Sequence, residues 1–266
     1  MPRSSALARF HPVAVEQSLV GKGAKMSARI SHEQANNRAA TTRTTARFLV
    51  REVLGLVMLA AILFLSAGRL DWLMGWAFVG IYFFWVCATG AILILRSPDL
   101  IAERLGPRKG AKTWDTAIMS VVGLTTIAKL VVAGLDLRFG WTTGISLPLQ
   151  VMAMIVASLA YALGGWAIAA NAYFSQIVRI QEERGHAVAS GGPYRFVRHP
   201  GYVGTIIFEL STPVMLGSWW ALIPGGLAAL LFVVRTSLED RTLREELNGY
   251  REYAQTVRYR LLPGVW

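Results

Sequence analysis

The hydrophobic pattern of the chain consists of apolar segments of membrane-spanning length, separated by short polar connections. Four of these segments lie at residues 49–68, 71–95, 115–135 and 147–174. A fifth apolar stretch divides near Gly217 into two shorter arms, 202–216 and 219–236. About 20 predominantly apolar residues are enough for a helix to cross the hydrocarbon core of a bilayer. The pattern therefore predicts an all-α integral membrane protein with about six transmembrane helices, four single helices followed by a helical hairpin.

The composition agrees with a membrane protein. Of the 266 residues, 54% are hydrophobic and 16% are charged, whereas a soluble domain carries about 25% charged residues. The net charge of +11 would suggest nucleic-acid binding in a soluble chain, but the sequence has no RNA-binding or zinc-finger motif. Cys87 is the one cysteine and lies in an apolar segment, which excludes a disulfide framework and a cysteine-based metal site. We therefore expect membrane lipids as partners, with no nucleic acid and no metal.

The basic residues outside the spans are distributed unevenly between the two sides of the membrane. If the N-terminus is cytoplasmic, the outward connections at 69–70 and 136–146 contain only Arg69 and Arg138 as basic residues. The opposite connections carry a larger set: Arg96, Arg104, Arg108, Lys109, Lys112, Arg179, Arg184, Arg195 and Arg198. Short cytoplasmic loops are enriched in lysine and arginine. We therefore expect both termini, and the polar residues able to do chemistry, on the cytoplasmic face.

Three regions follow from this division of the chain. Residues 1–47 are predicted to form a disordered basic tail, with Met26 as an alternative first residue, although an organelle transit peptide has a similar composition. Residues 48–174 carry the first four helices, and 175–266 contain the polar segments of chemical interest. Within the last region, 237–257 has the pattern of a separate amphipathic segment that Asn248 and Gly249 break into two pieces.

Lys129 and Glu209 are charged residues that lie well inside the predicted spans rather than at their ends. Lys129 lies towards the outer end of the third span, where its side chain can reach the interface. Glu209 lies in the first arm of the hairpin. A carboxylate at that depth is costly and is by default a functional candidate. The alternative is that Glu209 pairs with a nearby arginine or forms a hydrogen bond within the hairpin.

The stretch with the strongest chemical signal is GGPYRFVRHPGY at residues 191–202. Its prolines and glycines prevent a helix from passing through it. The chain has no glycine-rich nucleotide loop, no HExxH metal motif and no GxSxG nucleophile elbow. The pattern alone therefore predicts a site at the cytoplasmic ends of a helical bundle and leaves the reaction open.

The string RIQEERGHAVASGGPYRFVRHPGYVG at 179–204, followed by RTSLED at 235–240 and GYREY at 249–253, resembles the isoprenylcysteine carboxyl methyltransferase family. More broadly it is similar to membrane methyltransferases that include phospholipid N-methyltransferases. The resemblance implies S-adenosyl-L-methionine as cofactor, in a cytosolic pocket that the C-terminal helical segment closes. It implies the following cofactor contacts: Gln181, His186, Ala187, Val188, Ala189, Tyr194, His199, Pro200, Gly201, Tyr202 and Glu239. Arg179 competes with Gln181 for its position, and Arg235 would face the lipophilic methyl acceptor.

These residue types suit methyl transfer to a carboxylate. Glu239 can hold an ammonium group or ribose hydroxyls, and a guanidinium such as Arg235 matches a carboxylate in a bidentate pair. A carboxylate acceptor is ionised at pH 7 and needs no general base. An amine acceptor would have to lose a proton, which would make Glu209 or Glu239 a candidate base.

Several alternatives remain open at this stage. The reaction could be transfer to a phospholipid amine, or the chain could be a sterol-reductase-like membrane enzyme that uses NADPH. A transporter subunit or a membrane scaffold would bind no cofactor at all. Arg235 and Glu239 could also form an ordinary i,i+4 ion pair, and Arg198 could bind only lipid headgroups.

Overall fold

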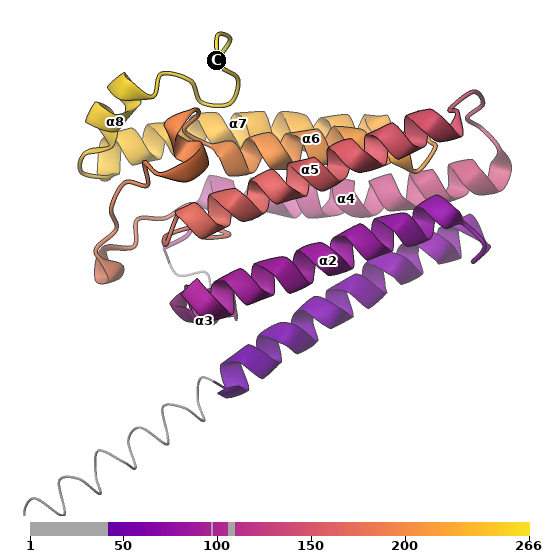
Figure 1. Cartoon of the computed structure of the whole chain (residues 1–266), viewed down its shortest axis with the longest axis horizontal. Helices are drawn as coiled ribbons and strands as arrows, with labels where there is room; N and C mark the ends of the chain where they lie inside the picture. Colours follow the sequence, from indigo (N-terminus) through magenta and orange to yellow (C-terminus); the bar gives the residue numbers. More distant parts are fainter. Residues whose placement is uncertain (1–41, 97, 106–109) are drawn as a thin grey trace, which may run out of the picture. The chain divides into compact units, whose positions relative to one another are not determined.

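The computed structural model describes residues 42–96, 98–105 and 110–266, and Arg47–Trp266 form one compact unit (Figure 1). In these ranges every regular element is helical. The α-helices are an N-terminal helix Thr42–Ala67, α2 Leu73–Arg96, α3 Pro98–Leu105, α4 Thr113–Phe139, α5 Leu147–Ala170, α6 Pro200–Met215, α7 Leu222–Glu246 and α8 Tyr250–Thr256. Most of the predicted tail, residues 1–41, lies outside the described residues, and 42–47 are helical.

Five of these helices are long and apolar enough to cross a membrane: the N-terminal helix, α2, α4, α5 and α7. The prediction of an all-α integral membrane protein is confirmed. The hairpin consists of α6 and α7, which turn at Gly217 in the left-handed conformation, with a φ of 77°. At 16 residues, α6 is shorter than a full crossing requires.

The structure corrects two predicted boundaries. Helix α5 ends at Ala170 rather than at residue 174, because Asn171 has extended backbone angles and starts the connection to α6. Helix α7 continues to Glu246, so the span at 219–236 and the start of the amphipathic segment are one helix. No glycine or proline interrupts the chain between Thr236 and Glu246. The predicted break follows at Gly249, with a φ of 79°.

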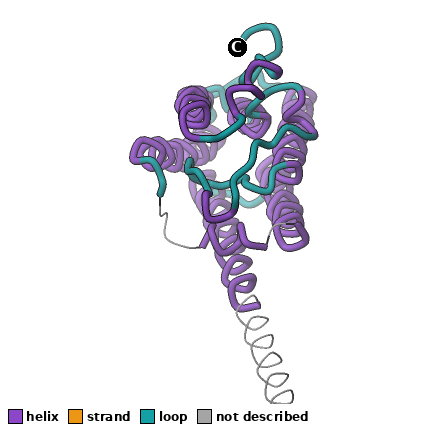
Figure 2. The backbone as a smooth tube through the Cα atoms, turned by 90° about the vertical axis from the view of Figure 1, so that its left-hand side faces the viewer, coloured by secondary structure: helices purple, strands orange, loops and turns teal. Residues whose placement is uncertain are grey.

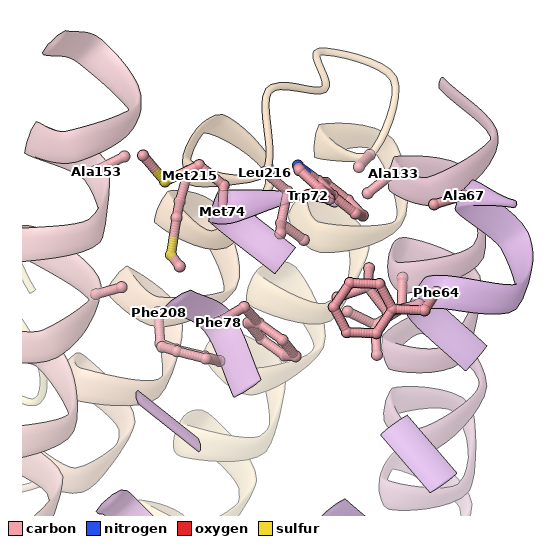
Figure 3. Close-up of a cluster of buried hydrophobic side chains, with 14 of the residues drawn as sticks. Phe64, Ala67, Trp72, Met74, Phe78, Ala133, Ala153, Phe208, Met215 and Leu216 are labelled. Atoms are coloured by element: carbon pink, nitrogen blue, oxygen red, sulfur yellow. The ribbon is translucent and has the colours of Figure 1, made fainter. Parts of the chain in front are cut away.

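The main core lies between the membrane helices and is formed by aromatic and aliphatic side chains. Figure 3 shows Phe64, Phe78 and Phe208 in this cluster. Helices α5 and α6 approach closely at Gly204, where an added Cβ would lie 2.5 Å from the carbonyl oxygen of Ala160. Small residues at such crossings allow helix backbones to pack directly in a membrane. This packing fixes the start of α6 against the end of α5.

Lys129 and Glu209 form a buried ion pair between α4 and α6. Lys129 Nζ donates to Glu209 Oε2 at 2.6 Å, and the two side chains are 1% and 8% exposed. The expectation that Lys129 reaches the interface is therefore wrong, because a partner of opposite charge is available inside the bundle. Glu209 makes this contact inside the core and does not line the cavity described below.

Candidate functional site

A cavity of about 420 Å³ lies where α4, α6, α7 and α8 meet the connection between α5 and α6. Figure 2 shows the end of the bundle at which the connections between helices run across the helix ends. The volume is within the roughly 300–1,000 Å³ of small-molecule and cofactor sites. Apolar residues such as Met119 and Phe232 line the cavity together with polar ones.

One wall of the cavity is the irregular segment His186–Ala189. Gly185 closes the preceding turn with a φ of 63°. The Tyr173 ring packs on the His186 imidazole with their centroids 4.6 Å apart, and the Tyr173 hydroxyl donates to Gly185 O at 2.9 Å. In the described part of the chain, the backbone amides of residues 187–189 have no hydrogen-bond partner. They are therefore able to bind a ligand.

Gln181 supports this wall from behind. Its side chain is fully buried, Nε2 donates to Tyr173 O at 2.8 Å, and Oε1 accepts from Arg184. Gln181 does not line the cavity, whereas Arg179 does. The geometry favours Arg179, the competing position, over the predicted Gln181.

The opposite wall is the turn from Arg198 to Tyr202 that starts α6. Pro200 is the first residue of the helix, where a proline costs no hydrogen bond. Pro200 itself is buried and does not line the cavity, while His199 and Tyr202 do. Their rings stack with centroids 5.8 Å apart. The Tyr202 hydroxyl donates to Glu239 Oε2 and so fixes that carboxylate at the cavity surface.

Arg235 is held in the cavity wall by Asp115 of α4. Its Nε donates to Asp115 Oδ1 at 2.7 Å, and its Nη2 donates to Gln176 O at 2.9 Å. Asp115 is fully buried, and its second oxygen accepts the Val178 amide. The possible i,i+4 pair between Arg235 and Glu239 does not form, because Asp115 and Tyr202 supply better-placed partners. Among the described residues, Arg235 Nη1 has no hydrogen-bond partner and can donate to a ligand.

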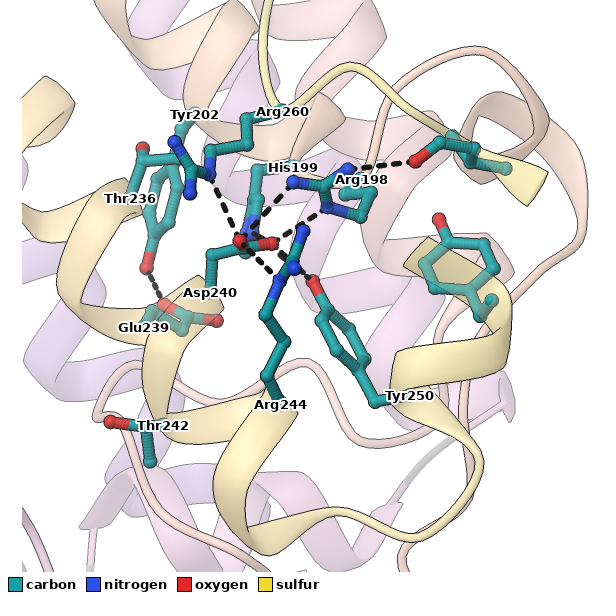
Figure 4. Close-up of polar contacts among 12 residues, drawn as sticks. Arg198, His199, Tyr202, Thr236, Glu239, Asp240, Thr242, Arg244, Tyr250 and Arg260 are labelled. Carbon is teal, nitrogen blue, oxygen red and sulfur yellow. Dashed lines mark hydrogen bonds and ion pairs between the residues drawn. The ribbon is translucent and has the colours of Figure 1, made fainter. Parts of the chain in front are cut away.

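Beside the cavity, Asp240 is the centre of a dense polar cluster (Figure 4). Arg198 binds it with Nε at 2.7 Å and Nη2 at 3.1 Å, and His199 Nε2 lies 3.4 Å from Oδ1. The Tyr250 hydroxyl donates to Oδ1 at 3.0 Å. Burial, together with the neighbouring Asp240 carboxylate, raises the pKa of Tyr250 far above its usual value, so the hydroxyl remains a neutral donor. The cluster fixes His199 at the edge of the cavity.

The C-terminal strap, residues 258–266, is bound to the same turn. The Arg198 amide donates to Tyr259 O at 2.9 Å, and the His199 amide donates to Arg260 O at 3.0 Å. From α8, the Tyr253 hydroxyl donates to the backbone oxygen of Tyr194 at 2.7 Å. Arg198 is therefore a buried structural residue and not only a headgroup ligand.

Most of the predicted site residues come together in this cavity: His186, Ala187, Val188, Ala189, Tyr194, His199, Gly201, Tyr202, Arg235 and Glu239 line it, and Gln181 and Pro200 do not. The sequence interpretation missed Asp115, Asp240 and the segment 171–178. Asp115 could have been identified from the sequence, because a charged residue at the start of an apolar span normally has a specific partner.

Comparison with known proteins agrees with this geometry. Residues 150–245 match the model of the isoprenylcysteine carboxyl methyltransferase (ICMT) family. This part of the chain is similar to the ICMT family. The match runs through most of α5, the cavity-lining connection, α6 and nearly all of α7, so it includes every predicted site residue.

Three relatives show how far the similarity to ICMT proteins extends. The "Probable protein-S-isoprenylcysteine O-methyltransferase" of Oryza sativa subsp. indica is 35% identical over 92 residues, 34% of this chain and 48% of that protein. "Protein-S-isoprenylcysteine O-methyltransferase A" of Arabidopsis thaliana is 34% identical over 97 residues, 34% of this chain and 47% of that protein. The Schizosaccharomyces pombe "Protein-S-isoprenylcysteine O-methyltransferase" is 38% identical over 52 residues, 20% of this chain and 22% of that protein. The chain thus spans about half the length of the plant relatives.

Proposed function

We propose that this protein is an S-adenosyl-L-methionine-dependent methyltransferase that esterifies a carboxylate on a lipophilic acceptor. One observation carries the proposal. A single cavity at the end of a membrane helix bundle contains Arg235, Glu239 and the His199–Tyr202 turn. The names of the relatives point to the same reaction class.

The cavity residues fit the cofactor by size and by chemistry. The unpaired amides of Ala187–Ala189 can bind a carboxylate. Glu239 can take an ammonium group or ribose hydroxyls, and the face of Tyr194 suits an adenine or a sulfonium. Tyr202 lines the cavity with its ring already in contact with His199, Phe232 and Arg235. His186, His199 and Gly201 complete the contacts. When bound, S-adenosyl-L-methionine supplies a methyl group already activated on sulfur.

Arg235 is the residue that we assign to the acceptor. Its Nη1 has no hydrogen-bond partner in the described part of the chain, and Met119 and Phe232 give the same cavity an apolar surface. A carboxylate bound there is ionised at pH 7, so the site needs to orient it rather than deprotonate it. Positioning alone can contribute on the order of 7–11 kcal/mol to such a reaction. The distribution of arginine and lysine further supports a cytoplasmic orientation of the cavity and of both termini.

A labelling experiment tests the reaction. Membranes containing the wild-type chain are incubated with S-adenosyl-L-methionine labelled in the methyl group and with a prenylated cysteine as lipophilic carboxylate. We expect label in a base-labile ester, a large loss in Arg235→Gln, and no loss in Arg241→Gln, which changes an exposed arginine of the same helix that pairs with Glu245. Label in a base-stable amine would assign N-methylation instead. Binding of NADPH without binding of S-adenosyl-L-methionine would refute methyl transfer.

A further inference from the structure

The cluster around Asp240 contains more positive than negative charge. Arg198, Arg244 and Arg260 all contact this one carboxylate. The nearby acids of α7 are already paired, Glu245 with Arg241 at 2.9 Å and Glu246 with Lys112 at 2.6 Å. In the described ranges, Asp240 is thus the one acidic partner of three guanidinium groups.

Two of these guanidinium groups keep donors for a further anion. Arg244 and Arg260 each use Nε on the same oxygen, Asp240 Oδ2, at 3.0 and 2.9 Å. Their terminal nitrogens have no hydrogen-bond partner in the described part of the chain, and the side chains are 42% and 27% exposed. Arg198 differs, because its Nη1 is already bound to Val257 O and Arg258 O. Both guanidinium groups contact the same carboxylate oxygen and keep terminal N–H groups, the kind of donor that binds a phosphate.

The cluster lies at the depth of lipid headgroups. From Leu222 to Asp240 helix α7 rises about 27 Å at 1.5 Å per residue, close to the roughly 30 Å of the hydrocarbon core. The other end of the helix follows the exposed Trp219 and Trp220, typical interfacial residues. The strap next to Arg260 exposes Leu262 and Val265, whose apolar side chains are expected to contact acyl chains.

We propose that Arg244 and Arg260 bind the phosphate of an anionic phospholipid at the membrane surface that carries the cavity. The lipid offsets the excess positive charge around Asp240 and holds the strap in place. Because the His199 amide donates to Arg260 O, the bound lipid also stabilises the wall of the cavity. This site is separate from the proposed cofactor and acceptor positions and does not depend on the reaction.

Native mass spectrometry of the delipidated full chain in detergent tests the site by titration with phosphatidylglycerol and with phosphatidylcholine. We expect tighter binding of the first phosphatidylglycerol than of phosphatidylcholine. Arg244→Gln should weaken phosphatidylglycerol binding about five-fold, the effect of one basic residue near an anionic surface. Arg241→Gln removes the same charge from the same helix, one turn from Glu245, and should leave binding unchanged.

Two more variants separate the phosphate contact from the packing of the strap. Arg260→Gln removes a phosphate donor and also a contact that fixes the strap, so the phosphate contact itself is tested by Arg244→Gln. Val265→Asp tests the acyl contact without changing the Asp240 cluster. Arg260→Gln and Val265→Asp should each weaken phosphatidylglycerol binding. Equal binding of the two lipids, or equal loss in Arg244→Gln and Arg241→Gln, would overturn the proposal. Displacement of the lipid by inorganic phosphate at similar concentration would show a site for free anions and would also overturn it.

Discussion

Asp115 positions Arg235, and Asp115→Asn tests whether that positioning supports the reaction. Asparagine has nearly the same size and keeps one oxygen acceptor, but it removes the negative charge. The change affects the 2.7 Å contact to Arg235 Nε and the 2.9 Å contact from the Val178 amide. Arg235 would then remain buried, at 5% exposure, without a carboxylate partner.

The size of the effect follows from this burial. Removing one partner of a buried ion pair costs about 3–5 kcal/mol, because the remaining charge is left uncompensated. If about 3–4 kcal/mol of that cost falls on the orientation of Arg235 in the transition state, kcat/KM for the acceptor drops about 100- to 1,000-fold. The affinity for S-adenosyl-L-methionine should change little, because Asp115 does not line the cavity.

Steady-state methyl transfer measures kcat/KM for the acceptor, and titration with S-adenosyl-L-methionine measures the affinity for the cofactor. Asp136→Asn is the matched control, since Asp136 is buried on the same helix and accepts the Thr142 amide at 2.6 Å, at the end of α4 remote from the cavity. It should lower stability and leave the activity per folded molecule unchanged. Activity of Asp115→Asn within three-fold of wild type would refute the positioning role, and so would an equal loss of activity in both variants.

Three further predictions concern packing and the cavity wall. Lys129→Met or Glu209→Gln alone should destabilise the protein by about 3–5 kcal/mol, and the double variant should recover most of this in a thermal unfolding cycle; additive losses would contradict a direct pair. Gly204→Ala should lower stability by at least about 1–3 kcal/mol through overpacking against α5, whereas Gly226→Ala, with open space around it, should be neutral or stabilising in the same unfolding assay. Tyr253→Phe removes one hydrogen bond to the wall and should weaken cofactor binding about five-fold by calorimetry, at about 1 kcal/mol; unchanged binding would show that this bond does not shape the cavity.

The sequence predicted the first four long helices because their apolar segments had membrane-spanning length. Hydrophobic length did not predict helix ends that are determined by tertiary contacts. Helix α7 extends past Arg235 because its polar part packs against Arg198 and Tyr250, and these contacts join residues up to 42 positions apart in sequence. Hydrophobic periodicity carries no information about such partners.

The site was predictable where one short string determines it and unpredictable where distant residues meet. The turn from His199 to Tyr202 and the acid at Glu239 were predicted from the resemblance of their motifs to the family, and the structure brings them to one cavity. The partner of Arg235 was not, because Asp115 lies 120 residues earlier in the chain. Gln181 was predicted as a cofactor contact, but its side chain does not line the cavity, because spacing alone cannot show whether a side chain points into a cavity or away from it.

Calorimetric titration of the purified protein with S-adenosyl-L-methionine tests the central claim most directly. We predict a single site in the wild type and in Arg241→Gln, with affinity about 10- to 100-fold weaker in Glu239→Gln, the loss expected for a charged hydrogen-bond partner. The affinity should also be weaker in His199→Ala, which removes a ring from the cavity wall. Unchanged affinity in both Glu239→Gln and His199→Ala, or no binding to the folded wild type, would contradict it.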